Sequence, residues 1–188
     1  MKEVMAEVLF SPEAIAARVK ELGAQISKDY EGKELVVVGV LKGSLLFMAD
    51  LIREIKTPLR YDLIAVSSYG ASTSSSGIVR IIKDIDVSIE NEHVLVIEDI
   101  VDTGLTLRYL ITTLSSRQPA SLKSCVLLDK PSRRKIEITP DYNGFVIPDR
   151  FVVGYGLDFA QRYRQLPMIA VLKPEVYSAE KNGEKEGN

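Results

Sequence analysis

The sequence predicts an α/β protein built on a doubly wound, mainly parallel sheet. Short apolar runs alternate along the chain with longer segments whose apolar residues recur at helical spacing. This alternation is typical of a parallel sheet that is covered by helices. A length of 188 residues is enough for one domain with a sizeable core. We expect a single domain over residues 1–177 and a disordered, charged tail over residues 178–188.

The first predicted helix is followed by a central strand. Ser11 and then Pro12 are typical of a helix start, and apolar residues follow at helical spacing until Gly32 ends the segment. The β-branched apolar run of residues 35–41 predicts a strand buried on both faces. After a short turn, residues 45–55 predict a second helix.

A polar loop separates the next two predicted strands, which span residues 59–67 and 78–82. The intervening residues 67–77 are rich in serine and unable to pack into a core. Long loops inside a compact domain are often functional. The loop is therefore either a flexible connector or a lid that closes over a reactive site.

The segment of residues 94–107 carries the strongest signal of chemistry. Its apolar run predicts a buried strand that ends in Glu98 and Asp99, and Asp102 follows in a turn of small residues. A helix is predicted next, over residues 107–114. Open α/β sheets bind ligands at the carboxyl ends of their strands, and helix N-termini attract anions. Acids beside such a turn indicate a sugar phosphate with a shared divalent cation, although alone they could be a helix cap and a solvated strand end.

The last part of the chain departs from the strict alternation. Residues 122–128 predict another strand, and the polar loop 129–135 follows it. Residues from about 141 to 165 carry aromatic side chains and do not fit the alternation. We expect them, together with the N-terminal segment, to form a small hood or flap over the strand ends. Residues 168–172 predict a final strand.

Composition excludes several classes of protein. The chain is 46% hydrophobic and 27% charged, as in an ordinary globular protein, and its formal net charge is −2. No overall positive charge therefore attracts it to nucleic acid. Its one cysteine, Cys125, and its one histidine, His93, exclude an intrachain disulfide and give little support to a zinc site or a Ser–His–Asp triad.

Neither a membrane span nor a secretory signal is visible in the sequence. No apolar run reaches the ~20 residues that a spanning helix needs, and the N-terminus lacks a basic segment followed by an apolar core. We expect a cytoplasmic protein whose partners are small molecules rather than nucleic acid or membrane.

Four blocks together resemble the type I phosphoribosyltransferases, and most closely the bacterial hypoxanthine phosphoribosyltransferases. They are the acidic strand and turn at 94–107, the start of the polar loop at 67–70, and residues 127–131 and 149–158. The first block resembles the family's signature for phosphoribosyl pyrophosphate (PRPP). The motifs follow the family's order over residues 8–172, so the resemblance implies the family's fold and its hood.

The resemblance also implies which residues bind PRPP. They are Lys42, Gly43, Glu98, Asp99, Asp102, Thr103, Gly104, Leu105, Thr106 and Arg164. Lys42 and Gly43 match the family's pyrophosphate loop, and Arg164 matches an arginine whose planar fork suits phosphate oxygens. Leu105 is a departure, because some relatives carry a lysine there, and we expect it to change phosphate affinity modestly.

The same resemblance implies which residues bind the purine base. Lys130 would donate a hydrogen bond to the 6-oxo group, for which an ammonium is suited, whereas it is unsuited to the amino group of adenine. Phe151 would stack on the base, the backbone of Val152 would read its edge, and Asp158 would lie near the exocyclic position.

Catalysis is implied for three residues. Asp102 would handle the proton on purine N7 as general acid or base. Ser68 and Tyr69 would meet the pyrophosphate when the polar loop closes as a lid, which keeps water from the reacting carbon. The implied cofactor is Mg²⁺, and its implied protein ligands are Glu98, Asp99 and Asp158.

The implied reaction is purine salvage: transfer of 5-phosphoribosyl from PRPP to N9 of hypoxanthine or guanine, which yields IMP or GMP and pyrophosphate. The resemblance also implies a homodimer or homotetramer. One alternative is an enzyme that prefers xanthine or a pyrimidine; Lys130 argues against a pyrimidine. The other is a nucleotide-sensing regulator that binds nucleic acid on the same fold. The weak net charge and the retained Asp102 and Arg164 argue against that regulator.

Overall fold

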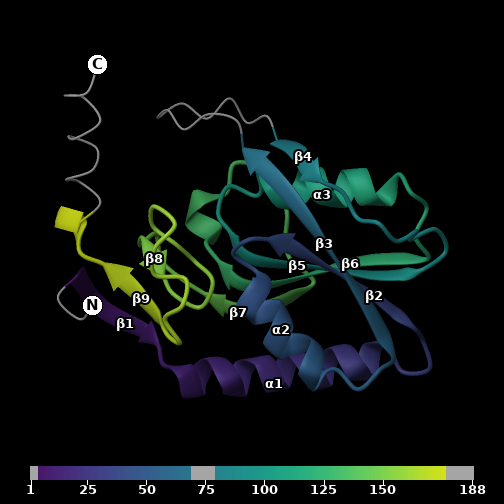
Figure 1. Cartoon of the computed structure of the whole chain (residues 1–188), viewed down its shortest axis with the longest axis horizontal. Coiled ribbons are helices and arrows are strands. Elements are labelled where there is room, and N and C mark those ends of the chain that lie inside the picture. Colours follow the sequence, from purple (N-terminus) through teal and green to yellow (C-terminus); the bar gives the residue numbers. More distant parts are fainter. Residues whose placement is uncertain (1–3, 69–78, 177–188) are drawn as a thin grey trace.

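A sheet of six strands, in the order β4-β3-β2-β5-β6-β7, forms the centre of the structure (Figure 1). The computed structural model describes residues 4–68 and 79–176. The strands of this sheet are β2 (Leu35–Leu41), β3 (Leu59–Ser68), β4 (Val79–Lys83), β5 (His93–Val101), β6 (Ser121–Asp129) and β7 (Tyr142–Val146). Only the pairing of β3 with β4 is antiparallel. The prediction of an α/β fold with a mainly parallel sheet is confirmed. Most of the predicted polar loop and the predicted tail lie outside the described residues.

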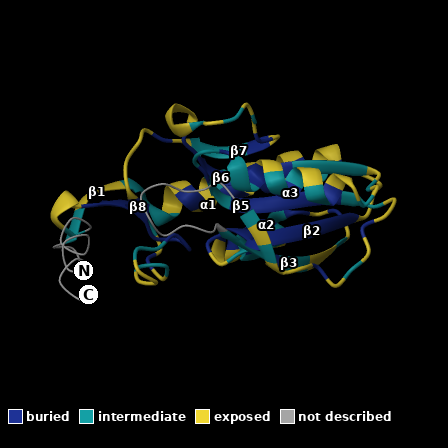
Figure 2. Ribbon diagram, turned by 90° about the horizontal axis from the view of Figure 1, so that it is seen from above, coloured by how far each residue is buried: buried dark blue, intermediate teal, exposed yellow. Residues whose placement is uncertain are grey.

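Helices cover the two faces of this sheet. They are α1 (Pro12–Asp29), α2 (Leu45–Glu54) and α3 (Leu105–Ser115). Successive strand residues face opposite ways, so Val37 packs in the cluster that includes α1 and α2, whereas Val36 packs with Leu110 of α3. Figure 2 shows these central strands buried between the helices. This double burial explains why the central strands are continuous apolar runs.

The starts of α1 and α3 each have a local cause. The Oγ of Ser11 accepts a hydrogen bond from the backbone N–H of Ala14 at 3.3 Å, as expected for an N-cap. The third helix begins at Leu105, two residues earlier than predicted. Gly104 precedes it with a φ of 85°, a left-handed conformation that suits glycine and turns the chain sharply into the helix.

A second, three-stranded antiparallel sheet forms the hood. Its order is β1-β9-β8, with β1 (Met5–Phe10), β8 (Val152–Val153) and β9 (Ile169–Leu172). β1 is absent from the sequence-based prediction because three of its six residues are exposed and it lacks an alternating pattern. β9, predicted as the final strand, belongs to this hood sheet and not to the central sheet.

The boundary of the hood also differs from the sequence-based expectation. β7, which lies within the segment assigned to the hood, is instead the edge strand of the central sheet and runs parallel to β6. Its residues include Asn143 and Gly144, which do not favour strands. Pairing with β6 therefore defines this strand, rather than its own sequence.

No helix within residues 4–68 and 79–176 is long and apolar enough to cross a membrane.

Candidate active site

Most of the predicted site residues lie where the carboxyl ends of three parallel strands meet. β2 leads into Lys42 and Gly43, β5 ends in the acidic segment, and β6 leads into Lys130. A cavity of about 560 Å³ opens there. Its lining residues are Asp99, Ile100, Asp102, Lys130, Arg133, Asp149, Phe151, Val152, Leu157 and Asp158. The cavity brings residues predicted for PRPP together with residues predicted for the base.

The turn between β5 and α3 forms a smaller hollow beside this cavity. The hollow has a volume of about 80 Å³, and Glu98, Thr103 and Thr106 are among its lining residues. A β-carbon at Gly104 would lie 2.7 Å from a methyl carbon of Ile138, so the turn has no room for a side chain there. Gly104 also gives α3 no side-chain cap. The N–H of Leu105 donates to Oγ1 of Thr103 at 3.4 Å, and the next amides of α3 remain available to an anion, as a phosphate site requires.

Two acids at the end of β5 are held in an unfavourable environment for their charge. Glu98 is buried, and its Oε2 has no hydrogen-bond partner within the described parts of the chain. Burial, and then the charge of Asp99, raises the pKa of Glu98 well above its usual value. Burial also raises the pKa of Asp99 to about 6, although the backbone N–H of Ile100 donates to it at 3.0 Å. A bound cation would relieve both carboxylates.

The donor set fits a cation that arrives with its own oxygen ligands. Within residues 4–68 and 79–176, no group of three or more His, Cys, Asp or Glu side chains is placed to hold one metal ion. Asp158 accordingly forms no such group with Glu98 and Asp99. Its Oδ1 lies 2.8 Å from Nη2 of Arg164. Magnesium commonly takes one or two protein carboxylates and completes its shell with water and phosphate oxygens.

The loop after β2 packs between the acids and the hood. A β-carbon at Gly43 would lie 1.7 Å from Oδ2 of Asp99, and a β-carbon at Gly156 would lie 2.0 Å from the carbonyl oxygen of Gly43. The peptide bond between Leu41 and Lys42 is cis. Lys42 is exposed and can offer its charge to an anion at this loop. Three segments far apart in the sequence therefore converge on Gly43.

The other side of the cavity has the character of a base-binding pocket. Lys130 is buried, and burial lowers the pKa of its ammonium, while Asp102 and then Asp149 counteract this shift. Phe151 is 40% exposed, and the centroid of its ring lies 5.6 Å from that of Phe159, with the two rings perpendicular to each other. An exposed aromatic face beside a buried donor can recognise a flat heterocycle with a carbonyl group.

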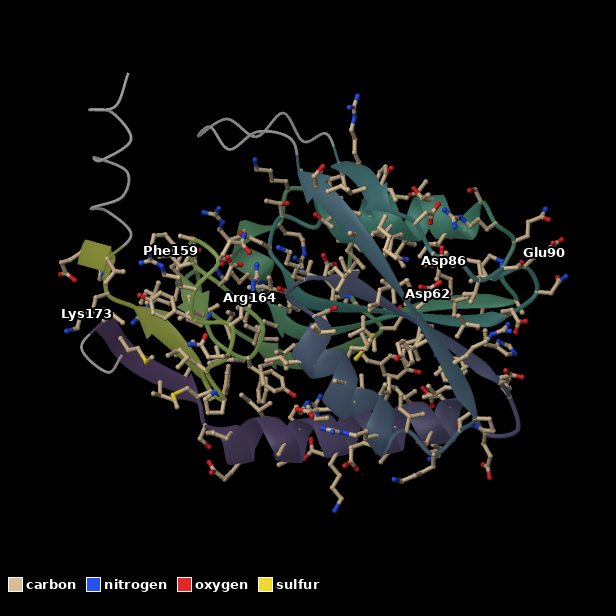
Figure 3. The ribbon with its side chains drawn as sticks, in the orientation of Figure 1. Asp62, Asp86, Glu90, Phe159, Arg164 and Lys173 are labelled. Carbon is tan, nitrogen blue, oxygen red and sulfur yellow. The ribbon has the colours of Figure 1, made fainter. Side chains whose placement is uncertain are left out.

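Arg164 reaches toward the site from the hood, and Figure 3 labels it near Phe159. Its Nη1 donates to the carbonyl oxygen of Gly156 at 2.8 Å, and it is also paired with Asp158. It is close enough to Asp99 for its charge to lower the pKa of that carboxyl, against the larger effect of burial. The predicted pyrophosphate arginine therefore belongs to the same electrostatic environment as the acids.

Two charged residues of the cavity, Arg133 and Asp149, are not predicted from the sequence. Nε of Arg133 donates to Oδ1 of Asp102 at 3.1 Å, and its Nη1 lies 3.5 Å from Oδ2 of Asp149. The signals that could have indicated them are the basic run after Lys130 and the acid that begins the block of residues 149–158. Neither signal distinguishes a site residue from a solvated charge.

The two residues predicted for the lid are not placed in the site. Ser68 is the last residue of β3, and its backbone pairs with Val79 of β4, but its side chain is not described. Tyr69 lies outside the described residues. Their predicted contact with pyrophosphate stays a prediction.

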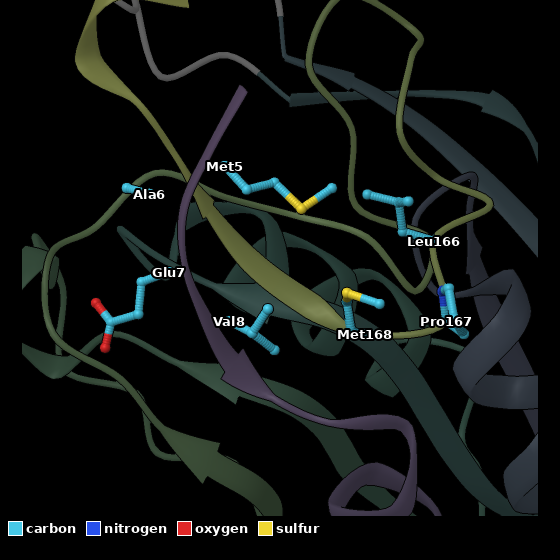
Figure 4. A pocket seen from close by; sticks show the side chains of 7 residues that line it. All are labelled: Met5, Ala6, Glu7, Val8, Leu166, Pro167 and Met168. Carbon is cyan, nitrogen blue, oxygen red and sulfur yellow. The ribbon is translucent and has the colours of Figure 1, made fainter. Parts of the chain in front are cut away.

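A second large groove, of about 570 Å³, lies on the hood (Figure 4). It is lined by Met5, Ala6, Glu7, Val8, Leu166, Pro167 and Met168. It shares no lining residue with the cavity at the strand ends, and Glu7 is its only titratable side chain. The acids, the lysine and the helix N-terminus that could bind a charged ligand therefore lie at the cavity at the strand ends, and not at this groove.

Known proteins are similar to this chain over most of its length. The family model for the phosphoribosyl transferase domain matches residues 6–160. A hypoxanthine-guanine phosphoribosyltransferase of Bacillus subtilis (strain 168) is 55% identical over 179 residues, which cover 95% of this chain and 99% of that protein. One of Staphylococcus aureus (strain Mu50) is 56% identical over 178 residues, with 95% and 99% covered. A crystal structure of a hypoxanthine phosphoribosyltransferase from Staphylococcus aureus superposes with a TM-score of 0.91 at 55% identity and covers 94% of this chain and 96% of that one.

Proposed function

We propose that this chain, an enzyme that belongs to the phosphoribosyltransferase family, transfers 5-phosphoribosyl from PRPP to N9 of hypoxanthine and guanine in purine salvage. The products would be IMP or GMP and pyrophosphate. The observation that carries the proposal is the single cavity that Asp102, Lys130 and Phe151 all line. It offers a proton acceptor, a buried donor and a stacking surface to one ligand. The hypoxanthine-guanine activity of the relatives supports the same substrate class.

PRPP would bind along the strand ends. Its 5′-phosphate would accept hydrogen bonds from the turn of residues 102–106 and from the hydroxyls of Thr103 and Thr106, at the N-terminus of α3. Glu98 and Asp99 would face the ribose hydroxyls. The pyrophosphate would meet Lys42, the backbone of Gly43 and Arg164, which combine charge with close backbone approach.

The purine would enter on the opposite side of the ribose. Lys130 would donate a hydrogen bond to the 6-oxo oxygen, and Phe151 would stack on the ring. Val152, which is buried in β8, would offer its backbone to the edge of the base. Adenine carries an amino group at position 6, so Lys130 would face a donor with a donor, and adenine would be rejected.

The chemical step would exchange one bond to the anomeric carbon for another. The C1′–O bond breaks and pyrophosphate leaves with its electron pair, while the lone pair of N9 forms the N9–C1′ bond. The carboxylate of Asp102 accepts the proton that N7 then loses. Ser68 and Tyr69 would close over the leaving group and exclude water.

Magnesium would neutralise the negative charge of PRPP and of the departing pyrophosphate. Glu98 and Asp99 would hold it with oxygens of PRPP, and Asp158 would hold a second ion through water; the orphaned Oε2 of Glu98 supports a cation there. The resemblance stated above also leads us to propose a homodimer or homotetramer.

The test is an assay of the purified full chain with PRPP and Mg²⁺, in which hypoxanthine, guanine, xanthine, adenine and uracil are offered separately. We expect nucleotide and pyrophosphate in equal amounts with hypoxanthine and guanine, loss of both on chelation with EDTA, and recovery on addition of Mg²⁺. PRPP binding without product from any base would contradict the proposal. Preferential use of xanthine would correct its substrate.

A further inference from the structure

One guanidinium connects the two halves of the cavity. Arg133 ends the short 3₁₀ helix η2 (Pro131–Arg133), directly after Lys130. Its Nε donates to Oδ1 of Asp102, on the turn after β5, and its Nη1 lies 3.5 Å from Oδ2 of Asp149. Asp149 begins the strap of residues 149–152, which also holds Phe151 and Val152 at the cavity. Arg133 therefore spans from the catalytic acid to the segment that would contact the base.

Stability does not explain this arrangement. The side chain of Arg133 is 49% exposed, and those of both its partners are similarly exposed. Ion pairs between such exposed groups contribute little to folding. The neighbouring Arg134 has the structural role instead, because it is 14% exposed, pairs with Asp129 and donates to the carbonyl oxygens of Val101 and Asp102.

Arg133 is also the only side chain in the described parts of the protein that hydrogen-bonds the carboxylate of Asp102. Because it binds Oδ1, it leaves Oδ2 without a side-chain partner. Arginine keeps its proton throughout the working pH range and does not compete for a proton as a lysine or histidine could. Its planar fork fixes direction as well as distance. These properties suit a group that orients a proton acceptor.

We infer that Arg133 is a positioning residue that couples occupancy of the purine pocket to the orientation of Asp102. A base that stacks on Phe151 fixes the strap, the strap fixes Asp149, and the Arg133 bridge then fixes the carboxylate toward the purine. This inference rests on the proposed function, since it assigns to Asp102 the proton transfer described above. It adds a residue whose effect is on turnover rather than on PRPP binding.

The test compares Arg133→Gln with Arg60→Gln. Arg60 is a matched control: its side chain is 44% exposed and pairs with Glu92 at 2.6 Å, and it lies near the start of β3, outside both the strap and the cavity. We expect Arg133→Gln to lower kcat about tenfold, to leave the KM for PRPP and the melting temperature within error, and Arg60→Gln to leave all three unchanged. Arg133→Lys should recover only part of kcat, because an ammonium lacks the fork.

Double variants distinguish a positioning role from a direct one. If Arg133 acts through Asp102, adding Arg133→Gln to Asp102→Asn lowers kcat no further, and Arg133→Gln with Asp149→Asn is no worse than Arg133→Gln alone. A wild-type chain that forms no nucleotide overturns both the proposed function and this inference. An active wild type with an unchanged Arg133→Gln variant, or with fully additive double variants, overturns the inference alone.

Discussion

Gly43 and Asp99 are in such close contact that a β-carbon on Gly43 would lie 1.7 Å from Oδ2 of the acid. Gly43 follows β2, and Asp99 lies near the end of the neighbouring parallel strand β5, which places the backbone of one against the carboxylate of the other. No side chain fits between them. The absence of a side chain at Gly43 is therefore a condition for the position of Asp99.

The first prediction concerns this contact. Gly43→Ala should displace Asp99 or the loop, lower kcat/KM for PRPP about 10- to 100-fold, and destabilise the chain by about 1–3 kcal/mol, as overpacking does. Steady-state kinetics and thermal unfolding would measure both effects.

Gly32→Ala is the control, because its φ of 73° strains an alanine while nothing lies within 4 Å of the new atom. It should lose stability and keep activity. Wild-type kinetics in Gly43→Ala would show that the contact is irrelevant to PRPP.

The second prediction concerns pH. Burial raises the pKa of Asp99 from 3.8 to about 6, so the folded chain binds more protons than the unfolded chain between these values. Ionisation of Asp99 therefore lowers the free energy of unfolding as pH rises from about 4 to 6, and this loss remains at higher pH. Asp99→Asn should raise the free energy of unfolding by about 1–3 kcal/mol at pH 8 and by less at pH 5.

Thermal or urea unfolding of both proteins at the two pH values would measure this difference. Asp86→Asn, at a largely exposed carboxylate, is the control and should show no comparable pH dependence. An equal effect of Asp99→Asn at pH 5 and pH 8 would rule out a raised pKa as the cause.

The third prediction concerns the proton acceptor. Asp102→Asn keeps the size of the side chain but removes its ability to accept and hold a proton. We expect kcat to fall by about 10²–10⁴-fold, while PRPP binding, measured by calorimetry, changes little. Near-normal turnover in this variant would remove the role of Asp102 in proton transfer.

The fourth prediction concerns recognition of the base. Lys130→Ala should raise the KM for hypoxanthine and guanine about tenfold or more, because it leaves the 6-oxo oxygen without its donor, and should leave the KM for PRPP unchanged. Lys135→Ala, an exposed lysine five residues further on, is the matched control. An unchanged KM for both bases would assign their recognition to another group.

The parts of the fold that the sequence predicts are those in which local pattern and burial agree. β2 and β5 are buried on both faces, so their apolar runs are unambiguous. β7 is not predicted, because residues 141–165 do not fit the alternation and are expected in the hood; only pairing with β6 defines this strand. β1 was missed for a related reason, since it is defined by its pairing with β9.

In the site, too, residues that form one local motif are predictable, whereas contacts made by tertiary packing are not. The acids at 98, 99 and 102 and the turn that follows are contiguous in sequence, so one motif predicts them together. Arg133 bridges residues that are 31 positions before it and 16 positions after it, and nothing local marks it. The close approach of Gly43 to Gly156 is likewise a product of tertiary packing.

The pairing of β1 with β9 determines the order in which the two halves of the site can be assembled. Met5 pairs with Leu172 and Phe10 with Ile169, so the hood sheet joins strands more than 150 residues apart. Such a distant pairing has a large loop-closure cost and depends on prior folding of the intervening chain. On the ribosome, the ends of β2 and β5 and the phosphate turn are synthesised by residue 106, whereas the hood strands are complete only at Leu172. A nascent chain would thus acquire the acids of β5 and the phosphate turn long before the hood that holds Phe151, Val152 and Arg164, and competence for the reaction would come last.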